Sequence, residues 1–508
     1  MVEGARLESV YGACASSQVR ILFSPPKKQL KRSMSYINQR TIIAFTTGFC
    51  LMAYELAAAR LLAPTVGSST YVWTSVIGVI IASLSFGFWQ GGKIADARHK
   101  KTDLAWLLLF IAAAILWTLC FNQAILSWVE GFAVDLRLQA VVVAVILFAP
   151  ASFLFGLISP YLAKLQVQTL TQTGQAVATL DASNSLGGIT GTFATGFVLF
   201  SYTGVRQTLA ILVVLILMMS WIITPRDGLM RRLIVSIGLI LAVITCLIMP
   251  PPYVTVDTAT ASYKIVDSQS QSGRTIRNLK TGPGGSQSGI YLDGSKQLPF
   301  WYTNEMARLA IKFQPRSILI LGGGALTLPE YLAKRLPETA IDVVELDPEL
   351  GKIAYDYFDY EAYPNVKLHF TDARTFINKP GDKYDLILVD VYSDSQVPAS
   401  LMTREYGDKI IDHLADKGQV VVNLIAGFKP AACRDLFGAM DAVYRNNLPH
   451  AKYSTNSANK LGRANYVAVY SRQSILDNSM TKLDNLGGKL YSDNFIPNER
   501  LYENCRRD

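Results

Sequence analysis

The stretch Ser317-Ile-Leu-Ile-Leu-Gly-Gly-Gly-Ala325, followed by Asp342-Val-Val-Glu-Leu-Asp347, carries the strongest structural signal in the chain. The apolar residues before the glycines predict a buried parallel strand, and Gly322 to Gly324 let the backbone approach a ligand where the next helix begins. Glu345 ends a second strand about 20 residues later, where a carboxylate can bind a ribose. A glycine triplet alone also suits any tight strand-to-helix turn, so the acid is what favours a nucleoside-binding α/β domain.

Two further predicted strands support the same sheet. Residues 366–370 lead into Asp372, and residues 384–390 end with Asp390. Open parallel sheets bind their ligands at the carboxyl ends of the strands. We therefore expect Glu345, Asp372 and Asp390 to converge on one crevice, although Asp390 alone would also suit a cap of the following helix.

The first half of this 508-residue chain is apolar, whereas the second half has the patterning of a soluble domain. Seven apolar segments are long enough to cross a bilayer, at residues 41–63, 72–92, 104–121, 140–162, 176–200, 208–223 and 233–249. The sequence thus predicts a multi-pass protein of the cell membrane, such as a bacterial inner membrane, with the lipid bilayer as a partner.

The net charge of +9 does not indicate a nucleic-acid partner, because the basic residues gather beside the apolar segments, at 27–40, 93–101 and 226–232. Basic loops of this kind favour the cytoplasmic side. Seven spans would then place residue 251 onward outside the cytoplasm, in conflict with a cytosolic nucleoside. A re-entrant segment would remove the conflict, and the polar fifth segment is the best candidate, so both topologies stay open.

Three charged residues fall inside the apolar segments, Glu55, Arg60 and Asp181, and Asn184 lies near the last of them. Charged groups in a bilayer need a partner or water, so they form structural pairs, snorkel to the interface, or line a substrate or proton path. Pro150 and Pro160 can kink or break the fourth segment.

The cysteines and histidines show no spacing that binds a metal. Six cysteines occur without a CxxC motif, and the four histidines are isolated in the sequence. We therefore expect neither a disulfide framework nor a metal site.

The polar, basic stretch before residue 34 does not resemble a cleaved signal peptide.

These features resemble the membrane-fused proteins of the spermidine synthase, or polyamine aminopropyltransferase, type. The resemblance covers roughly residues 257–471, and the phrases at 55–60, 63–69 and 184–187 are similar to those of the fused subgroup.

Three soluble motifs carry this resemblance. Residues 289–297 resemble the end of the family's small β-domain, and Asn304-Glu-Met306 matches the helix after it. Residues 390–403 resemble the loop that carries the family's catalytic aspartate.

The resemblance implies an N-terminal multi-span helical domain, a small β-domain and a Rossmann-like α/β domain of the kind shared by class I methyltransferases and spermidine synthases. The expected divisions are a basic segment at 1–40, transmembrane helices at 41–250, the β-domain at 253–300, the catalytic domain at 301–475 and a tail at 476–508. The family also implies a homodimer.

The resemblance further implies the roles of particular residues. Those implied to hold the nucleoside are Gly322, Gly323, Gly324, Glu345, Asp372 and Ala373. Those implied to face the acceptor amine are Gln297, Asn304, Glu305, Asp394 and Pro398. Asp390 would be the general base, since a protonated amine has no lone pair with which to attack the carbon beside a sulfonium.

Two departures from the family leave the activity open. Ala325 stands where the family has an acid, and Asn304 where it has a histidine. The leading hypothesis is an aminopropyltransferase that uses decarboxylated S-adenosylmethionine and an amine acceptor, without a metal. The alternatives are a methyltransferase that uses S-adenosylmethionine, and a transporter or sensor whose soluble domain has lost catalysis.

Overall fold

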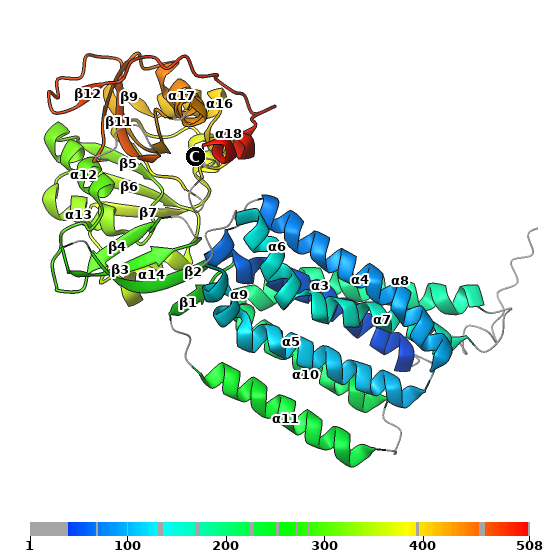
Figure 1. Ribbon diagram of the computed structural model, residues 1–508. Helices are drawn as coiled ribbons and strands as arrows, with labels where there is room; N and C mark the ends of the chain where they lie inside the picture. Colours follow the sequence, from blue (N-terminus) through cyan, green and yellow to red (C-terminus); the bar gives the residue numbers. More distant parts are fainter. Residues whose placement is uncertain are drawn as a thin grey trace, which may run out of the picture.

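The computed structural model describes most of residues 39–505, and Figure 1 shows a bundle of long helices with an α/β domain at one end. The residues inside this range that it does not describe are 68–69, 99, 131–135, 168–172, 224–227, 250–252, 271, 283–284, 393–395, 430 and 457–462.

The bundle is built from apolar helices that follow the predicted segments. Its elements are α3 (Gln39–Val66), α4 (Thr70–Ala97), α5 (Lys101–Glu130), α6 (Leu136–Leu147), α7 (Ala149–Gln166), α8 (Thr173–Ala194), the π-helix η2 (Thr195–Leu199), α9 (Phe200–Tyr202), α10 (Gly204–Ile222) and α11 (Leu229–Ile248). Among the described residues, five helices are long and apolar enough to cross a membrane. The pair α6 and α7, bent by 54°, would be a sixth span.

The bend in the fourth segment coincides with Pro150. This proline is the second residue of α7, a position where its missing N–H costs no helical hydrogen bond. Pro160 lies inside α7 without ending it.

The fifth segment, α8, is too polar to pass the same test, yet it runs beside α3 along the bundle. Its glycines permit the contact, because a Cβ at Gly187 would lie 1.9 Å from the carbonyl oxygen of Phe45, and one at Gly191 would lie 2.4 Å from that of Phe49. The later glycine of α8 meets the later residue of α3, so the two helices run in the same direction. The geometry therefore favours a segment that traverses the bundle over one that turns back.

The α/β domain sits at the end of the bundle where α3 and α11 finish (Figure 1). The backbone N–H of Val205, at the start of α10, donates to Asp257 Oδ2 at 2.7 Å. Arg60 of α3 donates to the carbonyl oxygens of Thr258 and Ala259. Hydrogen bonds as well as the covalent link therefore join the two halves of the chain.

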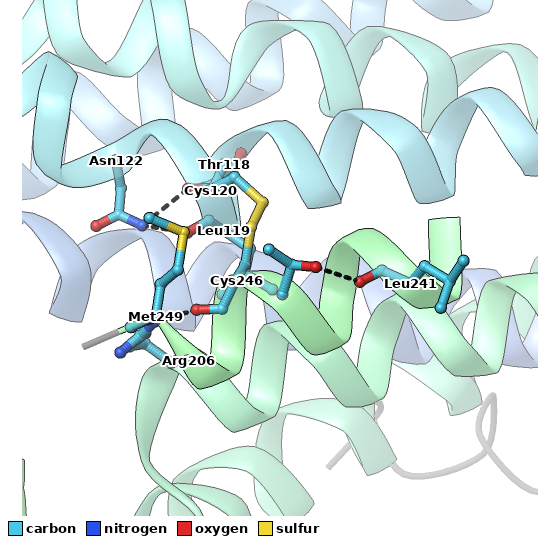
Figure 2. Close-up of a disulfide and its surroundings, with 9 residues drawn as sticks. Thr118, Leu119, Cys120, Asn122, Arg206, Leu241, Cys246 and Met249 are labelled. Atoms are coloured by element: carbon cyan, nitrogen blue, oxygen red, sulfur yellow. Dashed lines mark hydrogen bonds between the residues drawn. A yellow bond between two sulfur atoms is a disulfide. The ribbon is translucent and has the colours of Figure 1, made fainter. Parts of the chain in front are cut away.

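The expectation of no disulfide framework is wrong. Cys120 of α5 is bonded to Cys246 of α11, and Cys433 is bonded to Cys505 near the end of the chain. Figure 2 shows the first of these bonds beside Arg206, which donates to the carbonyl of Cys246. The partners are 126 and 72 residues apart, so only the packing of distant elements brings them together.

The soluble half contains two sheets. The first is antiparallel in the order β1 (Val254–Asp257), β2 (Ser262–Gln269), β3 (Thr275–Lys280) and β4 (Ser288–Tyr291). The second has eight strands in the order β12-β10-β11-β9-β8-β5-β6-β7, parallel from β9 to β7 and antiparallel from β9 to β12. This is the expected Rossmann-like sheet with the small β-domain before it.

The strands of the large sheet are β5 (Ser317–Leu321), β6 (Ala340–Glu345), β7 (Val366–Phe370), β8 (Tyr384–Val389), β9 (Leu414–Ala426), β10 (His450–Ser454), β11 (Ala464–Ser471) and β12 (Thr481–Lys482). The helices of this half are α12 (Trp301–Phe313), α13 (Thr327–Arg335), α14 (Glu349–Tyr357), α15 (Ala373–Ile377), the 3₁₀ helix η3 (Ala399–Leu401), α16 (Arg404–Asp412), α17 (Ala431–Arg445) and α18 (Asn498–Asn504).

The order of the strands places the ligand crevice. From β5 the chain moves to β6 and β7 on one side, then crosses to β8 on the other. Such a reversal leaves an opening at the carboxyl ends of the two central strands, where open α/β sheets bind ligands. Here those ends are followed by Gly322 and Asp390.

Candidate active site

The glycine loop after β5 has a conformation that other residues would resist. Gly322 has φ +94°, and a Cβ there would lie 2.2 Å from the carbonyl oxygen of Asp390. Gly324 has φ +52°, and a Cβ there would lie 2.5 Å from Ser288 Oγ. The absence of side chains thus lets the ends of β5, β8 and the small β-domain meet.

Glu345, at the end of β6, lies directly against this loop. Its Oε2 accepts the N–H groups of Gly323 and Gly324, both at 2.9 Å, and its Oε1 accepts that of Asp347 at 3.1 Å. Burial raises the pKa of Glu345, and these backbone N–H groups act in the opposite direction. The carboxylate therefore fixes the glycine loop against the end of β6, and its predicted role toward a ribose stays a prediction.

Asp390 follows β8 and is held by a chain of amides. Its Oδ1 accepts from Asn423 Nδ2 at 2.9 Å, and Asn423 Oδ1 accepts from Asn465 Nδ2 at 2.9 Å. Burial raises the pKa of Asp390 to about 6, against the lowering effect of the Asn423 hydrogen bond. A carboxylate with this pKa is ionised at neutral pH and can accept a proton.

Tyr302 of α12 lies close enough to Asp390 to feel its charge. Burial and that charge raise the pKa of the phenol well above its usual value, so Tyr302 is neutral and its hydroxyl donates to the carbonyl of Gln287 at 3.1 Å.

Asp372 caps α15 by accepting the N–H of Thr375 at 2.8 Å.

One cavity of about 570 Å³ contains these groups, a size that suits a small-molecule ligand. From the α/β domain it is lined by the glycine loop, Glu345, Asp372, Ala373, Asp390 and Pro398. Other residues of the soluble half also line it, and the helical bundle contributes Leu56, Ala59, Arg60, Ala63, Trp73, Gly196 and Phe200. The cavity thus lies between the two halves of the chain.

Three acceptor-side candidates lie elsewhere. Gln297 is exposed and accepts from Arg274 at 3.2 Å. Asn304 is exposed and donates to carbonyls next to its own helix, while Glu305 pairs with Arg308 at 2.8 Å. Pro398 lines the cavity, and Asp394 lies outside the described residues.

The helix that the resemblance singles out also contributes other residues to the cavity. Tyr302 and Thr303 line the cavity, whereas the next two residues turn away because each helical residue rotates by about 100°. Gln287 and Ser288, at the start of β4, also line it, and sequence reasoning missed them. Asn423 was missed because its role depends on β9 pairing with β8.

The Ala325 departure has a structural role. The side chain is fully buried in the core, and its N–H donates to Ser288 Oγ at 3.0 Å. The residue therefore contributes to the contact between the glycine loop and the β-domain, and its side chain supplies no charge to the cavity.

The polar residues of the bundle differ in their surroundings. The Arg60 guanidinium lies over the ring of Phe200, 4.4 Å from its centroid. Asp181 is exposed and accepts from Ser159 at 3.5 Å, and the backbone of Asn184 packs against Gly48. Of the residues Glu55, Arg60, Asp181 and Asn184, only Arg60 lines this cavity.

Comparison with known proteins agrees with this geometry. Residues 300–456 match the family model of the spermine/spermidine synthase domain. The polyamine aminopropyltransferase of Vibrio vulnificus is 35% identical over 155 residues, which are 30% of this chain and 50% of that enzyme. This chain thus matches half the length of that relative.

A second relative and one solved structure were also found. The polyamine aminopropyltransferase of Corynebacterium efficiens is 26% identical over 404 residues, 73% of this chain and 74% of that enzyme. The structure of a probable spermidine synthase from Corynebacterium glutamicum superimposes with a TM-score of 0.40 and 21% identity, covering 49% of this chain and 99% of that one. Residues 300–456 of this chain are therefore similar to the spermine/spermidine synthase domain.

Proposed function

We propose that the protein is a membrane-anchored aminopropyltransferase, which transfers an aminopropyl group from decarboxylated S-adenosylmethionine to an amine. The observation that carries this proposal is Asp390, a carboxylate with a pKa of about 6 that the Asn423 amide orients beside the glycine loop. The match of this region to the synthase domain and its aminopropyltransferase relatives supports the same conclusion.

The donor's nucleoside would occupy the carboxyl edge of the sheet. Gly322 to Gly324 would allow its close approach, and Glu345, next to this loop, would accept a hydrogen bond from a ribose hydroxyl. Asp372 and Ala373 would border the adenine. The sulfonium and its aminopropyl chain would then extend towards Asp390.

The reaction itself is one displacement. The acceptor ammonium gives a proton to the Asp390 carboxylate, and the freed nitrogen lone pair attacks the methylene carbon beside the sulfonium. As the new N–C bond forms, the C–S bond breaks and its electron pair neutralises the sulfur. The products are the aminopropylated amine and 5′-methylthioadenosine.

Membrane anchoring rests on the helical half. Five of its described helices are long and apolar enough to span a bilayer. The match to the Corynebacterium efficiens enzyme covers 73% of this 508-residue chain, more than the 258 residues that follow position 250, so the similarity extends into the helices.

Product analysis with two donors tests the proposal. The full chain, purified with its native lipids, would receive either decarboxylated S-adenosylmethionine or S-adenosylmethionine. We expect 5′-methylthioadenosine from the first donor and no S-adenosylhomocysteine from the second. The reverse result would make the protein a methyltransferase, and donor binding without either product would favour a sensor or transporter.

A further inference from the structure

The helical wall of the cavity has a chemistry unlike that of the synthase domain. Leu56, Ala59, Arg60 and Ala63 repeat at spacings of three and four, so one face of α3 continues from the bundle into the cavity. Apart from Arg60, none of the residues with which α3 lines the cavity is charged. The adjoining Trp73 lines the cavity and is 40% exposed, as expected of an aromatic residue at a membrane interface.

The charged groups of the described cavity lining suit one ammonium beside Asp390 better than the two of a free diamine. Among the described lining residues, the carboxylates are Glu345, Asp372 and Asp390, and all three belong to the synthase side. If Asp390 receives the reacting amine and the other two border the nucleoside, a second ammonium finds no carboxylate on the helical side. It would instead meet the guanidinium of Arg60, a like charge.

The same wall suits an anionic group attached to an apolar body. Arg60 donates to two carbonyls, but a guanidinium has five N–H donors and can also bind a phosphate. Beyond it, exposed apolar side chains such as Phe197, at 72% exposure, continue along the outside of the bundle. An acceptor with an amine, a phosphate and acyl chains would match the cavity, Arg60 and this surface in that order.

We propose that the acceptor is the primary amine of a phospholipid headgroup, which enters the cavity from the bilayer along α3 and α4. This inference rests on the proposed aminopropyl transfer and identifies its substrate class. Asp390 takes the proton of the headgroup ammonium, the nitrogen attacks the methylene beside sulfur, and the C–S bond breaks. An N-(3-aminopropyl) phospholipid and 5′-methylthioadenosine result.

The test uses the full chain reconstituted into vesicles of phosphatidylethanolamine, or of phosphatidylcholine, whose quaternary nitrogen cannot attack. Decarboxylated S-adenosylmethionine labelled in the aminopropyl group is added, with or without 1,4-diaminobutane. We expect 5′-methylthioadenosine and lipid-extractable label with phosphatidylethanolamine vesicles, and no lipid-extractable label with phosphatidylcholine vesicles. Label that enters only 1,4-diaminobutane would overturn the lipid acceptor while preserving aminopropyl transfer. No 5′-methylthioadenosine under any condition would contradict the transfer itself.

Two variants test the entry route. In Ala63→Phe the larger side chain fills part of the helical wall, and we expect about a tenfold loss in the rate with phosphatidylethanolamine and unchanged affinity for 5′-methylthioadenosine. Arg60→Gln should raise the apparent KM for the lipid by about tenfold, since one charge-assisted contact is lost. The matched control is Ile189→Phe, at an exposed site on α8 outside the cavity. Equal rates in Ala63→Phe and the control would overturn the route.

Discussion

Replacement of Asp390 by asparagine separates catalysis from stability. The exchange keeps the shape of the side chain and the oxygen that accepts from Asn423 Nδ2, but removes the group that takes the proton. General-base catalysis typically contributes 10²–10⁴-fold, so we expect a loss of about that size in the rate of 5′-methylthioadenosine release. The affinity for 5′-methylthioadenosine should change little, because the proposed nucleoside contacts lie on the glycine loop and β6.

The same exchange should stabilise the protein above neutral pH. The pKa of Asp390 rises from its ordinary 3.8 to about 6 on folding, and a rise of this size corresponds to about 3 kcal/mol. Because the folded state binds the proton more tightly, the ionised carboxylate opposes folding as pH rises from about 4 to 6, and the full cost applies above pH 6. Asp390→Asn should therefore unfold at a higher temperature than wild type at pH 8 and at nearly the same temperature at pH 4.

The assay is the initial rate of 5′-methylthioadenosine release between pH 5 and 9, paired with thermal unfolding of the full chain. The activity of the wild type should rise with pH, with a midpoint near pH 6. The activity of the variant should not show this rise. The control is Asp382→Asn, an exposed acid at the opposite end of the same strand, which should alter neither measurement. Near-normal turnover in Asp390→Asn, or lower stability than wild type at pH 8, would refute the assignment.

Three other predictions follow from the contacts. Glu345→Gln should weaken binding of 5′-methylthioadenosine by about tenfold in calorimetric titration, because a charged acceptor for a ribose hydroxyl is lost; unchanged affinity would exclude Glu345 from the site. Gly322→Ala should lower the thermal unfolding temperature more than Gly294→Ala, because both glycines have positive φ but only at Gly322 would the new Cβ lie 2.2 Å from a backbone oxygen; equal losses would contradict the close approach. The Cys433–Cys505 bond closes a loop of 72 residues, so its removal should cost about 4 kcal/mol in the chain-entropy model. In cells, both thiols should resist alkylation until reduced, and immediate labelling would place the domain in a reducing compartment.

The sequence allowed the site to be predicted where the chemistry follows a local rule. Parallel strands end at a common edge, so the residues after β5, β6 and β8 could be expected to meet, and Gly322, Glu345 and Asp390 do line one cavity. The apolar helices could likewise be predicted from segment length, although the polar α8 needed its glycine contacts with α3 to be placed.

Other features depend on contacts between distant elements. Asn423 can orient Asp390 only because β9 pairs with β8, which no local pattern states. The wall around Arg60 exists because α3 ends against the loop between β1 and β2. Gln297 lies in an exposed turn after β4, where its side chain accepts from Arg274, a contact that no local pattern predicts.

The most direct test of the whole account is a structure of the full chain in lipid with 5′-methylthioadenosine bound. We predict that the adenosine lies along Gly322 to Gly324 with its ribose on Glu345, and that the methylthio sulfur faces Asp390 across the cavity, with Arg60 on the opposite wall. A nucleoside bound elsewhere, or one whose sulfur points away from Asp390, would contradict aminopropyl transfer at this site.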